Sequence, residues 1–311
     1  MLRPQIYIRD RTNKLSRSDL NLIGDIAEKA ALGWGEHLSA TSSLTVDLSI
    51  QPGLDPAVAT TYVEYTVPVA SRKGQKVVAS VAAYKLATGF DFNGDLPDVK
   101  INLAYETVQR SLAENKSAYL YTIIIHELGH ALFLTGWEHY NIYDALTVFD
   151  LFLSGSADDP RFTGPNAARI AGEPVSITHA TGTHVGWDAA EAFRSPLGPA
   201  LTRGDVRPIT SLDVAMASDC GLPTDLDDTI LIGHFPGTVD AGAGVDTAAF
   251  DDFHQAYKLY RRGSDWVVTH EPTGYENTLQ NVEKLRFREP IGPPDATVTV
   301  TLPASADEIS L

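Results

Sequence analysis

The sequence predicts an α+β fold with two parts. Three observations support this class. A helical pattern is followed by alternating strands, a strongly apolar helix has ionisable side chains at its centre, and after residue 222 the sequence consists of short β-like runs separated by turn residues. Helices and strands that occupy separate runs of a sequence favour α+β folds. We therefore expect a larger domain over residues 1–222 and a smaller β-rich domain over residues 223–311.

The larger domain is expected to begin with an amphipathic helix over residues 16–37, because apolar residues recur there at intervals of three and four. Residues 43–51 (SLTVDLSIQ) alternate between apolar and polar side chains, which is typical of a strand with one buried face. A long apolar helix is expected to end near Gly136. Between these elements, further strands of the same sheet are expected at 62–69, 77–86 and 99–104.

The later segments differ in character from the first 136 residues. Residues 140–205 show little regular pattern, and so long an irregular stretch is usually functional, for example a loop that supplies a ligand. Thr210 or Ser211 is expected to cap a short helix that runs through Ser218. After residue 223, short β-like runs between turn residues predict the β-rich domain. These runs are TILIG, AYKLY, WVVTH and ATVTVTL.

The composition restricts the classes of partner and site. A formal charge of −16 argues against nucleic acids and anionic membranes as partners, because their phosphates would be repelled. Cys220 is the only cysteine, which excludes an intramolecular disulfide and a thiolate-rich zinc site. Ionisable residues at the centre of the most apolar segment disfavour a membrane span, so a buried helix fits better.

The most informative segment is the helix that carries HELGH at residues 126–130. His126 and His130 lie about 40° apart around a helix axis, so both imidazoles can reach one ion at about 2.0–2.1 Å. Glu127 is close enough to accept a proton from a water molecule that the ion activates. Because the flanking residues are strongly apolar, these groups are buried and must be paired or bound to a metal. The pattern predicts a zinc site with Glu127 as the catalytic base.

The third ligand cannot be derived from spacing alone. A catalytic zinc ion needs three protein ligands and an open fourth position. The short pattern with Gly three residues and His six residues after the second ligand is absent, because Phe133 and Gly136 stand there. His139 comes three residues late and would need a different turn to reach the ion. His139, His179 and His184 therefore remain candidates.

Five segments between about residues 15 and 222 together resemble bacterial metzincin-type zinc metallopeptidases, in which, as in leishmanolysin-like and serralysin-like peptidases, a long insertion precedes the third histidine. The segments are HELGHALF, FTGPNA, PVSIT, THVGW and DVRPITSLDVAMASDCGL. The resemblance implies a zincin-like catalytic domain with a twisted mixed sheet and an active-site helix. It also implies that His184, in the sequence His184-Val185-Gly186, is the third zinc ligand.

The resemblance carries further expectations and one departure. Such peptidases have a Met-turn beneath the metal, but the matching residues 195–201 contain no methionine, and Leu197 is expected to fill that position because its volume is similar. Residues 99–104 are expected to form the sheet edge along which an extended peptide adds. The tail resembles the module that follows calcium-binding repeats in exported bacterial proteins, which favours secretion. The last residues (ADEISL) are similar to C-terminal export signals, and a frayed terminus explains them as well.

A second cation is a weaker prediction. Residues 91–98 (DFNGDLPD) have the oxygen-donor spacing of a calcium loop but lack the distal Glu of an EF-hand. Both a solvated turn and a bound Ca²⁺ fit this pattern.

Taken together, the motifs predict a zinc-dependent endopeptidase that acts on a protein or peptide substrate. His126, His130 and His184 are expected to hold Zn²⁺, and Glu127 is expected to act first as base and then as acid toward the leaving amine. Two alternatives remain open: a zinc hydrolase of a non-protein substrate, and a binding protein with a vestigial zinc site. The intact Glu127 disfavours the second alternative, since a structural site needs no base.

Overall fold

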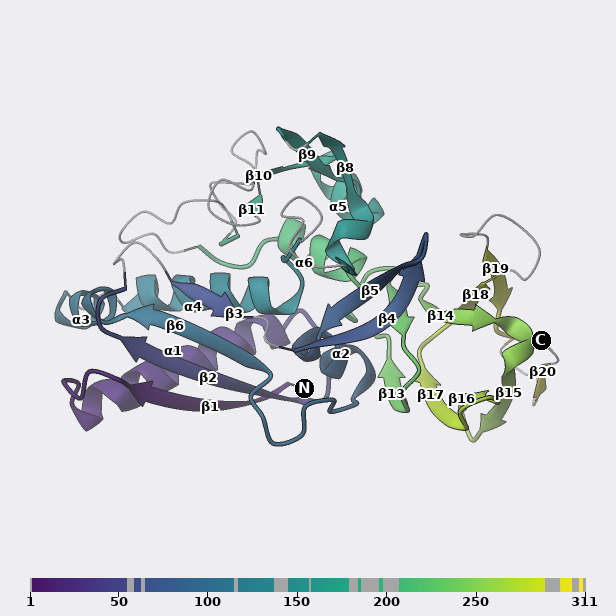
Figure 1. Cartoon of the computed structure of the whole chain (residues 1–311), viewed down its shortest axis with the longest axis horizontal. Helices are drawn as coiled ribbons and strands as arrows, with labels where there is room; N and C mark the ends of the chain where they lie inside the picture. Colours follow the sequence, from purple (N-terminus) through teal and green to yellow (C-terminus); the bar gives the residue numbers. More distant parts are fainter. Residues whose placement is uncertain are drawn as a thin grey trace.

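The described part of the chain has a mixed α+β architecture with six α-helices and several mixed sheets, which confirms the predicted class (Figure 1). A sheet with its helices lies at one end of an elongated molecule, and the β-rich C-terminal part lies at the other. The structure is a computed structural model. It describes residues 2–54, 59–62, 65–114, 117–136, 145–156, 158–178, 184–185, 196–197, 207–288, 297–303 and 308–309.

The N-terminal sheet has the strand order β1-β2-β6-β3. Three of its strands are parallel, and β3 pairs antiparallel with β6 at the edge. The expectation that residues 99–104 form the edge is therefore wrong: this strand is β6, and it pairs on both sides. The strands are β1 (Arg3–Asp10), β2 (Ser43–Gln51), β3 (Thr60–Tyr62) and β6 (Val99–Ala104).

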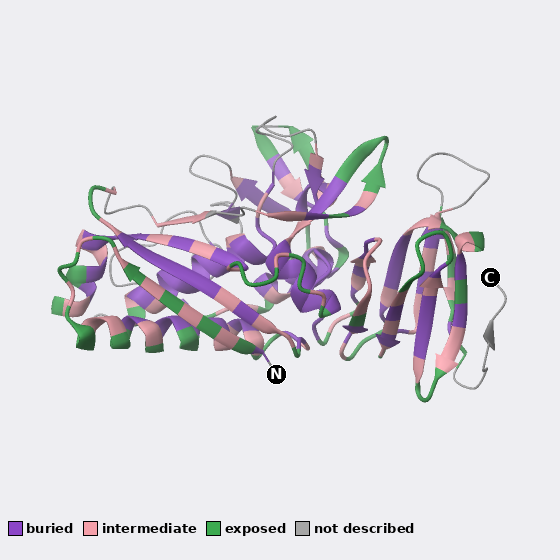
Figure 2. Ribbon diagram, turned by 60° about the horizontal axis from the view of Figure 1, so that its bottom comes forward, coloured by how far each residue is buried: buried purple, intermediate pink, exposed green. Residues whose placement is uncertain are grey.

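Three helices pack with this sheet, and Figure 2 shows buried residues throughout the central layer where they meet it. Helix α1 begins as predicted, because the Ser16 hydroxyl accepts a hydrogen bond from the Asp19 amide at 3.1 Å and completes a capping box. Near its end, the fully buried Trp34 donates its indole N–H to the carbonyl oxygen of Ile125 at 3.1 Å. This contact fixes α1 against α4. The helices are α1 (Arg17–Gly35), α3 (Tyr105–Ala113) and α4 (Ser117–Leu132).

The strand that is expected over residues 77–86 is only partly present. Residues up to Ser80 form the second strand of a hairpin, and a short helix follows. The strand ends at Ser80, whose hydroxyl accepts a hydrogen bond from the Ala83 amide at 3.0 Å and caps helix α2. All eight residues of α2 are buried, so the sequence shows no helical periodicity there. The hairpin pairs with β7 in the order β4-β5-β7. The elements are β4 (Thr66–Arg72), β5 (Gln75–Ser80), α2 (Val81–Thr88) and β7 (Ala145–Thr147).

The segment that looked irregular contains a small sheet, in the order β11-β10-β9-β8. The predicted helix that follows it is confirmed as α6, with Thr210 and Asp213 forming a capping box. The elements before it are the 3₁₀ helix η2 (Phe149–Phe152), β8 (Leu153–Ser156), β9 (Asp159–Phe162), α5 (Pro165–Ala171), β10 (Val175–Thr178) and β11 (His184–Val185), and α6 spans Ser211–Asp219.

The C-terminal part consists of two sheets, β12-β14-β18-β19 and β13-β17-β16-β15-β20, and all four predicted β-like runs form strands. Its buried apolar residues form a second core, separate from the one that extends to Leu222. The domain boundary at residue 223 stays a prediction. The strands are β12 (Thr229–Ile232), β13 (Gly237–Asp240), β14 (Thr247–Phe253), β15 (Tyr257–Arg262), β16 (Asp265–His270), β17 (Tyr275–Gln280), β18 (Lys284–Arg288), β19 (Thr297–Thr301) and β20 (Glu308–Ile309), with the 3₁₀ helix η3 at His254–Ala256.

Two buried aspartates lie where the chain passes from α6 to the second core. Asp228 accepts a hydrogen bond from the Thr224 amide at 2.6 Å, and its own amide donates to Asp246 Oδ1 at 2.7 Å. Asp246 Oδ2 is buried, and no described residue forms a hydrogen bond with it. The pKa of both carboxyl groups is raised to about 7, mainly by burial, and at Asp246 the charge of Glu283 contributes to this rise.

We expect Asp246→Asn to stabilise the protein more at pH 8 than at pH 5, by about 1–3 kcal/mol. The folded pKa of Asp246 lies above its ordinary value of 3.8, so the unfolded chain loses the proton first and stability falls as pH rises toward about 7. Asparagine keeps the acceptor for the Asp228 amide and cannot ionise. Urea unfolding at both pH values measures the difference. Asp225→Asn, at an exposed position between α6 and β12, controls for the loss of a negative charge. An equal gain at both pH values would contradict the expectation.

Candidate metal centre

Three histidine side chains meet in the structure. Helix α4 presents His126 and His130 one turn apart, and β11 brings His184 to the same place by pairing with β10. One ring nitrogen from each of the three lies within 4.8 Å of the others. The side chains of His126 and His184 are buried, and His130 is partly buried. Among the described residues, this group alone has the make-up and spacing to hold a metal ion.

Hydrogen bonds determine which nitrogens face the centre. Nδ1 of His126 lies 2.6 Å from the carbonyl oxygen of Pro196, and Nδ1 of His130 lies 2.9 Å from the carbonyl oxygen of Leu134. A carbonyl oxygen can only accept, so each Nδ1 carries the hydrogen and each neutral ring has its lone pair on Nε2. The carbonyl oxygens of Pro196 and Leu134 thus orient both rings for metal binding.

The distance between the two Nε2 atoms fits a zinc ion. They lie 3.1 Å apart, and two nitrogens bound to a tetrahedral zinc ion at about 2.0–2.1 Å are about 3.3 Å apart. Two facing lone pairs repel each other unless a cation lies between them. Burial lowers the pKa of His126 well below its usual value, and charge on His130 or His184 would lower it further. The ring of His126 is therefore neutral and available as a ligand.

The packing beneath the two histidines of α4 requires a glycine at position 129 of HELGH. Leu197 is fully buried, and a Cβ atom built on Gly129 would overlap its Cδ2 atom. The same Cβ would lie 3.4 Å from Cζ2 of Trp34. Only glycine lets Leu197 and Trp34 approach α4 this closely. Leu197 thus lies directly under the turn that carries both histidines, as expected from the sequence.

The carboxylate of Glu127 is buried beside the histidines. Its Oε2 atom accepts a hydrogen bond from the Thr61 hydroxyl at 2.7 Å, and its Oε1 atom lies 3.9 Å from His126 Nε2. Burial raises the pKa of Glu127 above its usual value. Thr61 belongs to the edge strand β3 and was not predicted from the sequence, because nothing in a three-residue strand marks a contact with a helix 66 residues away.

The alternative ligands stay open to experiment. His139 and His179 lie outside the described residues, whereas His184 lies beside the pair on α4. The histidine that the resemblance singled out is therefore the one that the structure brings to the other two.

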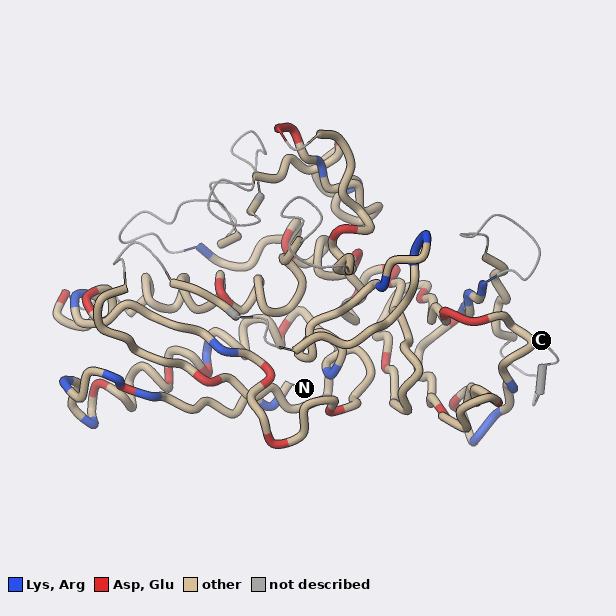
Figure 3. Tube along the Cα trace, in the orientation of Figure 1, with Lys and Arg blue, Asp and Glu red and all other residues tan. Residues whose placement is uncertain are grey.

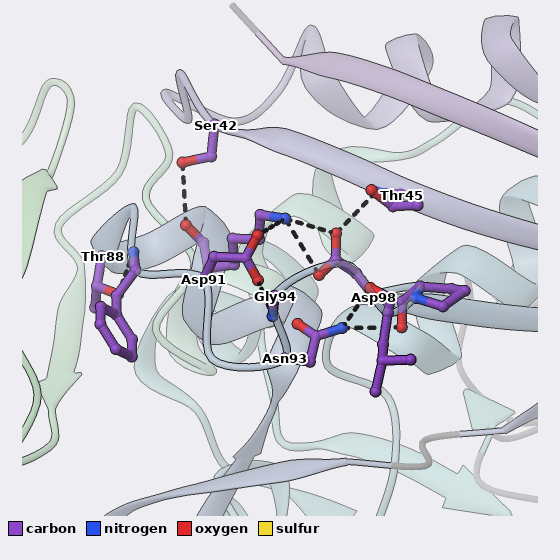
Figure 4. Close-up of polar contacts among 11 residues, drawn as sticks. Ser42, Thr45, Thr88, Asp91, Asn93, Gly94 and Asp98 are labelled. Carbon is purple, nitrogen blue, oxygen red and sulfur yellow. Dashed lines mark hydrogen bonds and ion pairs between the residues drawn. The ribbon is translucent and has the colours of Figure 1, made fainter.

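The loop with calcium-like spacing packs around a cation that helix α2 supplies (Figure 4). Lys85 Nζ lies 2.8 Å from Asp91 Oδ2 and 3.1 Å from Asp98 Oδ2. Burial alone would lower the pKa of Lys85, but the hydrogen bonds and charges of Asp91 and Asp98 outweigh burial and raise it. Asn93 caps the turn by donating to the carbonyl oxygens of residues 96 and 97. An ammonium group thus neutralises the two carboxylates that Ca²⁺ would need, and we do not propose Ca²⁺ here.

No family model matches the chain, and a search of the curated proteins found no match. The likeness to metzincin-type peptidases stays a resemblance carried by the motifs of this sequence. Among the helices of the described segments, none is long and apolar enough to cross a membrane.

Proposed function

We propose that the protein is a zinc-dependent endopeptidase in which His126, His130 and His184 bind the metal. The observation that carries the proposal is the convergence of two Nε2 lone pairs at 3.1 Å, with a third histidine and a buried carboxylate beside them. When bound, zinc supplies a Lewis acid that polarises the scissile carbonyl and lowers the pKa of a bound water molecule.

In this proposal Glu127 moves the proton. Its carboxylate takes a proton from the attacking water and then delivers it to the leaving amine. The Thr61 hydroxyl holds Oε2, which leaves Oε1 directed to the side of His126. The raised pKa of the buried carboxyl group favours a base that can also act as an acid.

The sheet edge supports a peptide as the substrate. Strand β3 ends the sheet β1-β2-β6-β3, and its Thr61 contacts the catalytic carboxylate. Among the described strands β3 is paired on one side only. An extended peptide that adds to its other side would place its backbone beside Glu127, which is how edge strands bind peptides. Secretion and the two-domain division at residue 223 belong to the same proposal.

Metal content and proteolysis test the proposal together. We expect the purified protein to hold zinc at stoichiometric level, and to cleave casein or a peptide library until a chelator removes the metal. His184→Ala should release zinc to a chromophoric chelator much more readily than the wild type, because a three-ligand site loses a ligand. The control is His37→Ala, which removes an exposed histidine at the end of α1.

Three other results would contradict parts of the proposal. Absence of bound zinc after metal supplementation would overturn the metal site. Unchanged zinc retention in His184→Ala would assign the third ligand elsewhere, with His139 and His179 as the candidates. A zinc-loaded sample that cleaves neither protein nor peptide would contradict the endopeptidase assignment and favour another hydrolase or a vestigial site.

A further inference from the structure

A polar face of the C-terminal part is turned toward the β4–β5 hairpin. Along β18, Leu285 and Phe287 point into the second core, so Arg286 and its neighbours at alternate positions lie on the opposite face. Arg286 pairs with Ala249 of β14, and β4 packs against β12 and β14. Figure 3 shows basic residues at the tip of the hairpin and on β18 across from it.

A cavity of about 380 Å³ lies between these elements. We call it the hairpin pocket, and its size is within the range of small-molecule sites, roughly 300–1,000 Å³. Apolar side chains from both sides line it, including Val69 of β4, Phe152 of η2 and Leu231 of β12. Its charged lining consists of Arg72, Arg286, Arg288 and Asp251. The pocket therefore combines an apolar wall with three guanidinium groups and one carboxylate.

Two of the three arginines have partners in the protein. Arg72 donates from Nη1 to the carbonyl oxygen of Leu151 at 3.1 Å. Arg288 lies over the ring of Phe253 at 5.4 Å, and its charge acts on Asp251. Asp251 itself accepts a hydrogen bond from the backbone of the hairpin. The remaining arginine of the pocket is Arg286.

Within the part of the chain that the structure describes, Arg286 is the pocket guanidinium without a partner. It is half-buried in the pocket wall, and among the described residues no carboxylate or carbonyl forms an ion pair or hydrogen bond with it. Burial lowers the pKa of Arg286, and no neighbouring acid opposes this effect. A guanidinium that is partly removed from water needs an anion to offset its desolvation.

The charged groups and the apolar wall of the hairpin pocket favour one chemical class of anion as the ligand. A planar carboxylate matches the fork of a guanidinium with two hydrogen bonds. Asp251 also lines the pocket, so a ligand with one negative charge meets less repulsion from this carboxylate than a dianion does. The apolar wall next to Arg286 suits a ligand whose body is hydrophobic.

We propose that the hairpin pocket is a second ligand site, which binds a small amphipathic monocarboxylate with its carboxylate on Arg286 and its apolar body against Val69 and Leu231. The site is distinct from the three histidines and does not depend on the proposed peptidase activity. Two sources could present this chemistry: a free aliphatic acid, or the C-terminal carboxylate of a short apolar peptide.

Calorimetric titration with defined probes tests the site on the full-length protein. We expect octanoate to bind, octanol and octyl phosphate to bind at least about ten times more weakly, and Arg286→Met to weaken octanoate by about 10- to 100-fold. Arg262→Met is the matched control, because it removes an exposed arginine on β15. An N-acetylated apolar dipeptide with a free C-terminus, compared with its amide, distinguishes the two sources.

Stability measurements separate binding from folding. Arg286→Met should unfold at the same or a higher urea concentration than the wild type, because it removes an unpaired cation from the pocket wall. Equal octanoate affinity in the wild type and Arg286→Met, or no binding of any carboxylate probe, would overturn the proposal. Marked destabilisation of Arg286→Met would also contradict it, because the arginine would then have a structural partner.

Discussion

Replacing Glu127 with glutamine should lower kcat for peptide hydrolysis by about 10²- to 10⁴-fold while zinc content stays unchanged. The amide has nearly the same shape as the carboxylate, and its oxygen can still accept the hydrogen bond from the Thr61 hydroxyl. It cannot accept a proton from water, so the loss falls on the chemical step. Steady-state kinetics on a fluorogenic peptide, with metal analysis of the same sample, measure both quantities.

Folding should not complicate this result. Glu127 is only 4% exposed, and a neutral amide is less costly to bury than a carboxylate, so the variant should be at least as resistant to urea as the wild type. Glu28→Gln, on the exposed face of α1, controls for the change of charge. A kcat within a factor of about three of the wild type would remove Glu127 from the mechanism. Loss of zinc together with activity would instead give it a structural role.

The part of the site that lies on one helix could be predicted, because local geometry determines it. Residues four apart on a helix share a face, so His126 and His130 follow from spacing, and the apolar flanks indicate burial. His184 sits on a two-residue strand held by β10, and only the resemblance pointed to it. Thr61 and the carbonyl of Pro196 reach the site through tertiary contacts that leave no pattern in the sequence.

The errors in the fold have similar causes. Helix α2 is buried on all sides, so it lacks the polar face that distinguishes a helix from a strand. Strand β1 was not predicted, because its residues alternate between exposed and half-buried positions and none of them is strongly buried. The edge position of β3 depends on pairing with β6, and pairing order is not a local property. Capped elements such as α1 and α6 were predicted well, because the capping residues are adjacent in sequence.

The second large effect concerns the buried ammonium group. Lys85→Met should lower the free energy of unfolding by about 3–5 kcal/mol, because it leaves Asp98 as an uncompensated buried charge. The side chain of Asp98 is fully buried, and its Oδ2 atom also accepts a hydrogen bond from the Thr45 amide at 2.8 Å. The carboxylate therefore cannot turn out to water without breaking a contact with β2. Urea unfolding at neutral pH measures the loss, and Lys76→Met, an exposed lysine on β5, is the matched control.

A double variant distinguishes loss of charge balance from loss of packing. Asn at position 98 still accepts from the Thr45 amide but carries no charge, so Lys85→Met with Asp98→Asn should recover part of the stability lost in Lys85→Met alone. If the double variant is less stable than Lys85→Met, packing of the lysine stem is the dominant effect. Millimolar Ca²⁺ provides the opposing test: stabilisation of the wild type by Ca²⁺ would mean that the Asp91–Asp98 loop binds a metal in place of the ammonium. We expect no such change, because Lys85 already occupies the position between the two carboxylates.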